Sequence, residues 1–220
     1  MEKLIFYYFT EERFGLKILR ERRLKISDIL ALNDPFDFLS VAGPTKASRQ
    51  TLREWRETMA KDTGLICFSR NWQSPVQWAH YADDHKGMAL GFEISAESLR
   101  QICYVQSRPL WPSTKPPWSQ AVQQWIVDQL LYTKFTHWSY EDEYRLFTEK
   151  ANREEDGNYY LNFSSNLQLR KVLVGDRCPC TRLTLTDALG PSAAEVEVFK
   201  VRPSFQEFRM VKQKAVEKWE

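Results

Sequence analysis

The sequence predicts a mixed α+β fold in which short strands outnumber helices. Three observations favour this class. Aromatic and β-branched residues gather in short runs, which is typical of strands. Helical spacing of apolar residues is confined to four segments between these runs. The 220 residues contain no internal repeat, and this length suits one domain. We therefore expect a single domain over 1–220, with a mixed, antiparallel-rich sheet flanked by helices.

The N-terminal elements alternate between strand and helix. Residues 4–9 combine aromatic and branched side chains and open the predicted sheet. Thr10 is a favourable N-cap for a helix that extends to about Arg22. Alternating apolar and polar residues at 24–27 then predict a short strand, and the turn-forming sequence at 33–35 interrupts the pattern.

A second helix and a buried strand follow. Ser48 or Thr51 begins the helix, and its apolar residues are spaced three and four positions apart. Gly64 is expected to end it. The compact apolar run at 65–69 then predicts a buried strand.

The clearest helix start lies at residues 74–77. Ser, Pro, Val and Gln there provide an N-cap, a proline at the first helical position and the Gln of a capping box. We expect this helix to reach about Asp84 and Gly87 to release the chain into a strand at 88–93. A last helix is predicted at 119–134. Further short strands are predicted at 143–148, 159–163, 170–174 and 195–201.

Composition excludes several classes of protein. With 31 basic and 29 acidic residues the net charge is +2, which does not indicate a nucleic acid or an anionic membrane as partner. The first apolar run is too short for a signal peptide or a membrane span, so we expect a cytoplasmic protein with reduced cysteines. Three histidines in the whole chain predict no metal site. Aromatic residues make up 14%, which favours a pocket for a flat ligand.

Trp78, Tyr81 and His85 form the first candidate cluster. They occupy positions i, i+3 and i+7 of a predicted helix, so we expect them on one face near its end. A stripe that carries an indole, a phenol and an imidazole is more polar than a core requires. The alternative is a core helix whose Tyr and His hydrogen-bond to neighbours.

Glu141, Glu143 and Arg145 form the second candidate cluster. In an extended segment they would share one face, with Tyr144 and Phe147 on opposite faces. A carboxylate in such aromatic surroundings would be partly desolvated and oriented for chemistry. The alternative is a solvated charged face on an edge strand.

A third cluster, residues 33–37, is interpreted mainly as a turn, because Asn and Asp bond to nearby backbone and Pro fixes φ. Familiar catalytic templates do not occur. The sequence contains no glycine-rich phosphate loop, no nucleophile elbow and no zinc-protease helix.

Six short segments together carry a resemblance to a known family. They are Phe6-Tyr7-Tyr8-Phe9-Thr10, Leu32-Asn33-Asp34-Pro35-Phe36-Asp37, Cys67-Phe68-Ser69, Trp78-Ala79-His80-Tyr81 with His85-Lys86-Gly87, Tyr140-Glu141-Asp142-Glu143-Tyr144-Arg145, and Lys171-Val172-Leu173-Val174-Gly175. In this order they resemble the bacterial domain-of-unknown-function family numbered 2971. The resemblance covers about residues 4–176 and leaves 177–220 as a C-terminal strand and helix extension. That family implies no activity.

A more distant resemblance is to the ADP-ribosyltransferase-like layout, above all to its DNA-modifying members. The shared order is an aromatic first strand with a Thr, a helix, a short strand ending in Ser, a Phe-Ser pair, an aromatic helix and a late Glu. This resemblance implies that NAD lies in the cleft of a split β-sheet. It also implies that an aromatic residue contacts the nicotinamide and that the late Glu contacts the adjoining ribose.

On this template Glu143 is expected as the catalytic carboxylate, Glu141 as the next candidate, and Tyr81 at the nicotinamide. Cleavage of the nicotinamide–ribose bond passes through an oxocarbenium-like state that a positioned carboxylate stabilises. The resemblance implies further ligand-binding residues: Trp78 as an alternative at the nicotinamide, Tyr8 and Thr10 on the adenosine side, Arg145 beside Glu143 or the pyrophosphate, and Ser27, Asn33 and His85.

The first strand departs from that template, because Tyr7-Tyr8 stand where a His or Arg is usual, so another nucleotide is an alternative to NAD. The leading expectation is an NAD-using transferase or glycohydrolase, acting on a protein or nucleic acid as a toxin or phage-defence effector. The first alternative is a non-enzymatic nucleotide-sensing or protein-interaction module that uses the same aromatic pocket. The second is a nucleic-acid enzyme or binder with metal ligands at 141–143, which the net charge disfavours.

Overall fold

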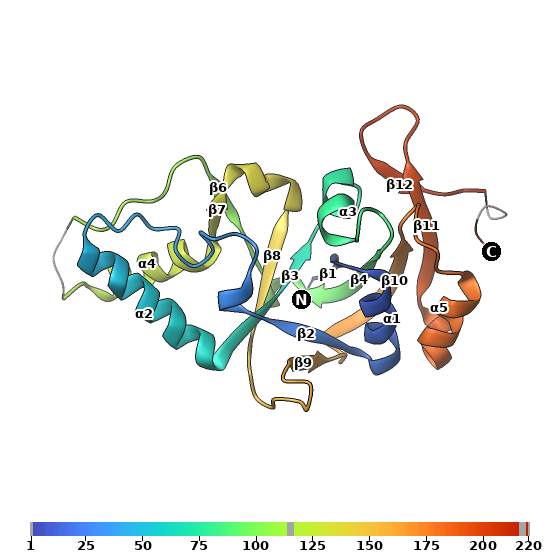
Figure 1. The fold of residues 1–220 in the computed structure, drawn as a ribbon, viewed down its shortest axis with the longest axis horizontal. Helices are drawn as coiled ribbons and strands as arrows, with labels where there is room; N and C mark the ends of the chain where they lie inside the picture. Colours follow the sequence, from blue (N-terminus) through green and yellow to red (C-terminus); the bar gives the residue numbers. More distant parts are fainter. Residues whose placement is uncertain (1, 114–116, 216–218, 220) are drawn as a thin grey trace.

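The computed structural model describes residues 2–113, 117–215 and 219. One curled sheet runs through the molecule, with helices packed against it (Figure 1). Its main path has the order β12-β11-β10-β4-β1-β3-β2-β9, and β8 and β5 extend it from β3. Among the described ladders of this sheet, only β10–β11 is parallel. The predicted α+β class with a mixed, antiparallel-rich sheet is confirmed.

The elements have the following bounds. The strands are β1 (Lys3–Thr10), β2 (Arg23–Asp28), β3 (Thr63–Ser69), β4 (Met88–Ser95), β5 (Arg100–Gln101), β6 (Cys103–Val105), β7 (Thr133–Phe135), β8 (Glu143–Glu149), β9 (Tyr159–Asn162), β10 (Leu167–Val174), β11 (Glu197–Pro203) and β12 (Met210–Lys212). The α-helices are α1 (Glu12–Glu21), α2 (Lys46–Asp62), α3 (Pro75–Tyr81), α4 (Gln120–Tyr132) and α5 (Arg182–Leu189). The 3-10 helices are η1 (Ile29–Ala31), η2 (Ala96–Ser98), η3 (Thr136–Glu141) and η4 (Gly190–Glu195). The predicted C-terminal extension thus contains α5, β11 and β12, and its residues 216–218 and 220 lie outside the described residues.

Two helices begin at other residues than the sequence predicts: α1 begins later and α2 begins earlier. Thr10 is the last residue of β1, and Glu11 takes the N-cap of α1 instead. Thr45 caps α2, and its side chain and that of Ser48 bond reciprocally to each other's backbone. Strand pairing with β4 takes Thr10 out of the cap position, and Glu11 makes no side-chain capping bond. At α2 the capping residue is of the predicted kind, but it lies three residues before Ser48.

α3 ends at Tyr81, three residues before the predicted end. Residues 83–85 all have positive φ, so the chain makes a left-handed turn there. This turn brings His85 back toward the helix. The imidazole ring of His85 stacks on the indole ring of Trp78, with 6.5 Å between the ring centroids. The expected face shared by Trp78, Tyr81 and His85 does not form, because a face at i+7 requires a further helical turn.

The sheet is covered on both faces around β4. Met88, Leu90 and Phe92 face the main core, where α1 and α5 pack against the sheet. Ala89 faces the opposite side, where the fully buried Trp78 of α3 fills a second core. Alternate residues of β4 therefore serve two layers, which explains its nearly continuous burial.

α2 and α4 pack together at the other end of the sheet (Figure 1). Leu52 of α2 contacts a cluster that includes Ile126 and Leu130 of α4. From α4 the chain passes directly through β7 and η3 into β8. This connection returns the chain from the helical end to the middle of the sheet, where the candidate site lies. Within the described residues, no helix is long and apolar enough to cross a membrane.

Candidate functional site

The sheet splits beside β3, and a pocket occupies the split. One edge of β3 pairs with β1 at Tyr7↔Ser69 and with β2 at Ser27↔Leu65. Between these two contacts, the ladders among described residues give 66–68 no partner on that edge. A cavity of about 220 Å³ opens there, which we call the aromatic pocket. Its lining residues are Tyr7, Tyr8, Phe9, Ser27, Leu32, Asn33, Asp37, Cys67, Phe68, Ser69, Gln77, Tyr81, Lys134, Glu141 and Glu143.

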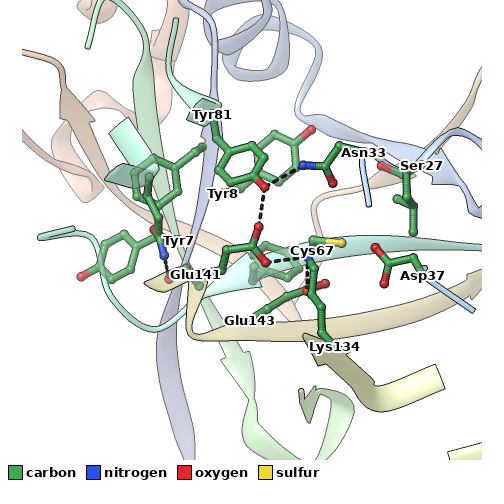
Figure 2. A pocket seen from close by; sticks show the side chains of 15 residues that line it. Tyr7, Tyr8, Ser27, Asn33, Asp37, Cys67, Tyr81, Lys134, Glu141 and Glu143 are labelled. Atoms are coloured by element: carbon green, nitrogen blue, oxygen red, sulfur yellow. Dashed lines mark hydrogen bonds and ion pairs between the residues drawn. The ribbon is translucent and has the colours of Figure 1, made fainter. Parts of the chain in front are cut away.

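Glu141 and Glu143 reach the pocket from different elements (Figure 2). Glu141 ends η3 and Glu143 begins β8, while Asp142 between them has a left-handed φ of 43°. The turn at Asp142 brings both carboxylates to the pocket. The shared face expected for an extended segment through Glu141 and Glu143 therefore does not form, and the strand begins at Glu143, as predicted. Both side chains are buried, and β8 lies between β3 and β5. The alternative of a solvated charged face on an edge strand is therefore wrong.

Lys134 joins the two carboxylates. Its Nζ donates to Glu141 Oε2 at 2.6 Å and to Glu143 Oε2 at 3.1 Å. The sequence predicted a helix through Lys134, but α4 ends at Tyr132 and the chain becomes extended in β7. Parallel pairing of β7 with β6 replaces the last helical turn and carries the ammonium group to the carboxylates.

Arg145 supplies the second cation. Its Nε donates to Glu143 Oε1 at 2.7 Å, and its Nη2 donates to Glu143 Oε2 at 3.2 Å and to Asp37 Oδ1 at 2.5 Å. Its Nη1 donates to the carbonyl of Leu131 at 2.9 Å. Arg145 does not line the pocket. Of its two predicted roles, the position beside Glu143 agrees with the structure.

These five groups form one buried unit, which we call the ion cluster. The exposed fractions are 2% for Asp37, 5% for Lys134, 6% for Glu141, 3% for Glu143 and 1% for Arg145. Three carboxylates face two cations, so the fully ionised cluster has one excess negative charge. An uncompensated buried charge is costly. The cluster therefore favours a proton on one carboxylate or a cation in the pocket.

The two glutamates have opposite pKa shifts. Burial would raise the pKa of Glu143, but Arg145 and Lys134 outweigh it and lower this pKa to about 2. Burial raises the pKa of Glu141, Lys134 opposes the shift and Glu143 adds to it, and the net effect is an increase. Glu143 is therefore held ionised, whereas Glu141 takes up a proton at a higher pH than an ordinary glutamate does. Carboxylate pairs with divergent pKa values are typical of acid–base sites.

Tyr81 connects Glu141 to the opposite wall of the pocket. Its hydroxyl donates to Glu141 Oε1 and accepts from Asn33 Nδ2 at 2.8 Å (Figure 2). Burial, together with the charge of Glu141, raises the pKa of Tyr81, so its hydroxyl stays protonated. Glu141 Oε1 is thus held by a neutral donor that a ligand hydroxyl can replace.

Gln77 fixes α3 over the pocket. Its Nε2 donates to Ser69 Oγ at 3.0 Å and to the carbonyl of Tyr140 at 2.7 Å. The predicted capping box forms only in part: Ser74 Oγ accepts from the Gln77 backbone, but the Gln77 side chain binds β3 and η3 instead. These bonds set the position of Tyr81, which lies one turn further along the same helix.

Apolar and weakly reactive groups form the remaining walls. Burial raises the pKa of Tyr8 to about 12, so Tyr8 presents a neutral ring. Burial also raises the pKa of the Cys67 thiol well above its ordinary value, and Glu143 adds to this increase. A thiol in that state is a poor nucleophile. Cys67 therefore contributes to the wall of the pocket rather than to nucleophilic chemistry.

The structure gathers most, but not all, of the predicted site residues. Those that line the pocket are Tyr8, Ser27, Asn33, Tyr81, Glu141 and Glu143. Trp78 packs edge-on against Phe9 in the core, which agrees with the alternative of a core helix. His85 faces Asp176 at 3.4 Å, and Thr10 lies beyond the pocket at the end of β1. Trp78, His85 and Thr10 are not among the lining residues.

Sequence reasoning missed Lys134 and Asp37. A single Lys in the mostly apolar segment 126–135 was a usable signal, since a lysine there needs a buried partner. Asp37 was assigned to a turn, and the turn is real: Asp34 Oδ1 accepts from the Phe36 backbone at 2.9 Å. The contact of Asp37 with Arg145 spans 108 positions, so no local pattern indicates it.

The stability that Glu143 contributes is expected to be lost in strong acid. Its pKa falls from an ordinary 4.5 to about 2 on folding, so the folded chain favours the ionised form. The contribution, on the order of 3 kcal/mol, is present above about pH 4.5 and is lost as the pH falls toward about 2. Urea denaturation of the wild type and Glu143→Gln across this range measures the effect. A difference in free energy of unfolding that does not change with pH would contradict it.

The described residues contain no group of three or more His, Cys, Asp or Glu side chains arranged to hold a metal ion. Asp142 accepts from Gln101 at 3.3 Å and does not line the pocket, so of the three carboxylates at 141–143 only those of Glu141 and Glu143 meet there. Comparisons of the chain with protein-family models, with curated proteins and with solved structures gave no match. The two family resemblances of the sequence stay predictions, and function is inferred from the pocket.

Proposed function

We propose that the aromatic pocket binds the nicotinamide–ribose end of NAD, and that the protein is an ADP-ribosyltransferase or NAD glycohydrolase acting on a protein or nucleic acid. The observation that carries this proposal is the excess negative charge of the ion cluster beneath aromatic walls. The nicotinamide ring of NAD is flat and cationic. It would gain contact with aromatic rings and would compensate the buried charge.

The size of the pocket supports occupation by one end of a dinucleotide. A volume of about 220 Å³ lies below the roughly 300–1,000 Å³ of pockets for whole drug-sized ligands. A ring and its ribose suit this volume, and the rest of the molecule would extend beyond the rim. The position in a split sheet also agrees with what the ADP-ribosyltransferase-like resemblance implies.

The chemistry needs a negative group beside the ribose. The bond between C1′ and the ring nitrogen breaks, its electron pair passes to the nitrogen, and neutral nicotinamide leaves. The positive charge then lies on the ribose, where a fixed carboxylate stabilises it. The incoming nucleophile, water or an acceptor group, bonds to C1′ and gives its proton to a carboxylate oxygen.

Glu141 suits the role of proton acceptor better than Glu143, which the sequence placed first. Both oxygens of Glu143 already accept charge-assisted bonds from Arg145 and Lys134. Glu141 Oε1 is held by the neutral hydroxyl of Tyr81, and burial raises the pKa of Glu141. A group with a pKa nearer the working pH is the more effective base. Glu143 then acts as a permanent negative charge that orients Lys134.

One observation favours the non-enzymatic alternative. The bonds among Glu143, Arg145 and Asp37 are complete in the chain alone, so the ion cluster also suits a rigid binding module. Such a module would bind a cationic ring, for which 1-methylnicotinamide is a simple probe, without consuming NAD. Binding of this probe together with unchanged NAD would favour the alternative.

The test is NAD consumption in a cell lysate, which supplies unknown acceptors. We expect purified protein to deplete NAD and to release one nicotinamide per NAD lost. A Glu141→Gln/Glu143→Gln double variant is expected to leave NAD unchanged, because both carboxylate charges are removed from the pocket. NAD and the released nicotinamide are both measured by chromatography. Equal NAD loss with the wild type and the double variant would reject the proposal, as would no loss with either.

A further inference from the structure

A second cavity adjoins the aromatic pocket and shares part of its wall. Its volume is about 510 Å³, and Ser27, Leu32 and Asn33 line both cavities. The other lining residues come from β2, η1, the end of α2, the segment after β8 and the start of β9: Lys25, Ile26, Asp28, Ala31, Ala60, Lys61, Lys150, Arg153, Gly157, Asn158 and Tyr159. We call this space the basic cavity.

The basic cavity has a net positive charge, whereas the ion cluster has a net negative charge. Four cations line it, and Asp28 is its one carboxylate among the described residues. Lys150 neutralises Asp28, since its Nζ donates to Asp28 Oδ2 at 2.9 Å and to the carbonyl of Ala60 at 2.6 Å. The remaining cations are Lys25, Lys61 and Arg153, and none of them forms an ion pair with a described residue.

Phosphate is the chemistry that these groups fit. Three uncompensated cations around a hollow focus a positive field and attract an anion. Arg153 is held in place by a bond from its Nε to the carbonyl of Gly157 at 3.0 Å, which leaves its terminal nitrogens free to donate to phosphate oxygens. Lys25 of β2 and Lys61 of α2 are exposed and add positive charge to the lining of the same cavity.

We propose that the basic cavity holds the phosphate groups of the same nucleotide whose ring and ribose occupy the aromatic pocket. This inference rests on the proposed function and specifies its ligand: a phosphorylated nucleoside with a flat cationic base. Ser27 and Asn33 stand at the junction of the two cavities, where the ribose of such a ligand would lie. The hydroxyl of Ser27 and the amide oxygen of Asn33 can hydrogen-bond to sugar hydroxyls.

A single small nucleotide explains the arrangement better than a nucleic-acid strand. Two contiguous cavities with opposite charge match one molecule with a cationic end and an anionic end. A strand would instead require a basic surface that extends along its backbone. The net charge of the chain is only +2, and the aromatic pocket beside the basic cavity carries the excess negative charge of the ion cluster.

The test compares two ligands that differ by one phosphate, nicotinamide riboside and nicotinamide mononucleotide, by calorimetry at low salt. We expect the mononucleotide to bind at least about tenfold more tightly, with the advantage decreasing as salt increases. Lys25→Glu/Lys61→Glu should remove this advantage and leave riboside binding unchanged. Lys46→Glu, a charge reversal at the exposed start of the same helix, is the matched control and should preserve it. Lys25→Gln/Lys61→Gln, which only removes charge, should have an intermediate effect.

The possible failures can be told apart. Equal binding of riboside and mononucleotide to the wild type would overturn this inference and leave the proposed function standing. Lysine-dependent binding of inorganic pyrophosphate without binding of either nicotinamide compound would support the phosphate site and overturn the proposed function. A single-stranded oligonucleotide that binds more tightly than the mononucleotide, through Lys25 and Lys61, would show that the phosphates belong to a second molecule and would overturn the inference. No binding of any probe would also overturn it.

Discussion

Glu141→Gln is expected to reduce NAD turnover by about 100- to 1,000-fold and to change the free energy of unfolding by less than about 1 kcal/mol. Loss of the proton acceptor removes general-base catalysis, and the amide cannot stabilise a positive ribose as a carboxylate does. Stability should change little, because burial already raises the pKa of Glu141 and the substitution removes the excess negative charge of the ion cluster. Initial rates of nicotinamide release and urea denaturation measure the two quantities.

Asp142→Asn is the matched control for this variant. Asp142 is adjacent in sequence, has a left-handed φ that Asn tolerates, and does not line the pocket. Its turnover should stay close to that of the wild type. Glu143→Gln should lose stability as well as turnover, since it leaves Arg145 with one full carboxylate, that of Asp37. Full activity of Glu141→Gln would remove Glu141 from the proposed mechanism, and a loss confined to Glu143→Gln would restore the order that the sequence suggested.

Local patterning is sufficient for much of the fold. The aromatic and branched residues of the first strand and the Ser-Pro start of α3 are signals carried by neighbouring residues, and both elements lie where these signals indicate. The order β10-β4-β1-β3 depends on pairings between distant segments and was not predicted. The turn after α3 also escaped prediction, because residues 83–85 adopt positive φ without a glycine.

The candidate site was predictable where residues that act together in the pocket are also close together in the sequence. Glu141 and Glu143 lie two positions apart, so a pair of carboxylates was visible in the sequence. Lys134 and Asp37 complete the ion cluster through contacts that depend on β7 and on a distant turn. Trp78 was predicted to contact the ligand, but the structure buries it in the core. Its spacing matched Tyr81, but burial of a large apolar ring stabilises the fold more than exposure in a pocket does.

Arg145→Met is expected to destabilise the protein by about 3–5 kcal/mol. The substitution leaves Glu143 and Asp37 buried with one cation fewer between them, and the Leu131 carbonyl loses its donor. Arg100→Met is the control. Arg100 lies opposite Arg145 in the register of β5 and β8, but its side chain forms an exposed ion pair with Asp128 at 2.9 Å. Exposed pairs contribute about 1 kcal/mol or less, so this variant should remain near wild-type stability.

A double variant separates the loss of charge compensation from the loss of packing. Arg145→Met/Glu143→Gln neutralises one of the two carboxylates that Arg145 holds, so it should be more stable than Arg145→Met alone. If the cost came from packing, the second substitution would add to the first instead. A loss below about 1 kcal/mol for Arg145→Met would mean that the buried carboxylates take up protons at little cost. In that event a proton would replace a missing cation in the ion cluster at little cost, so a cationic ring would gain little by compensating the excess negative charge. The electrostatic basis of the proposed NAD site would then be lost.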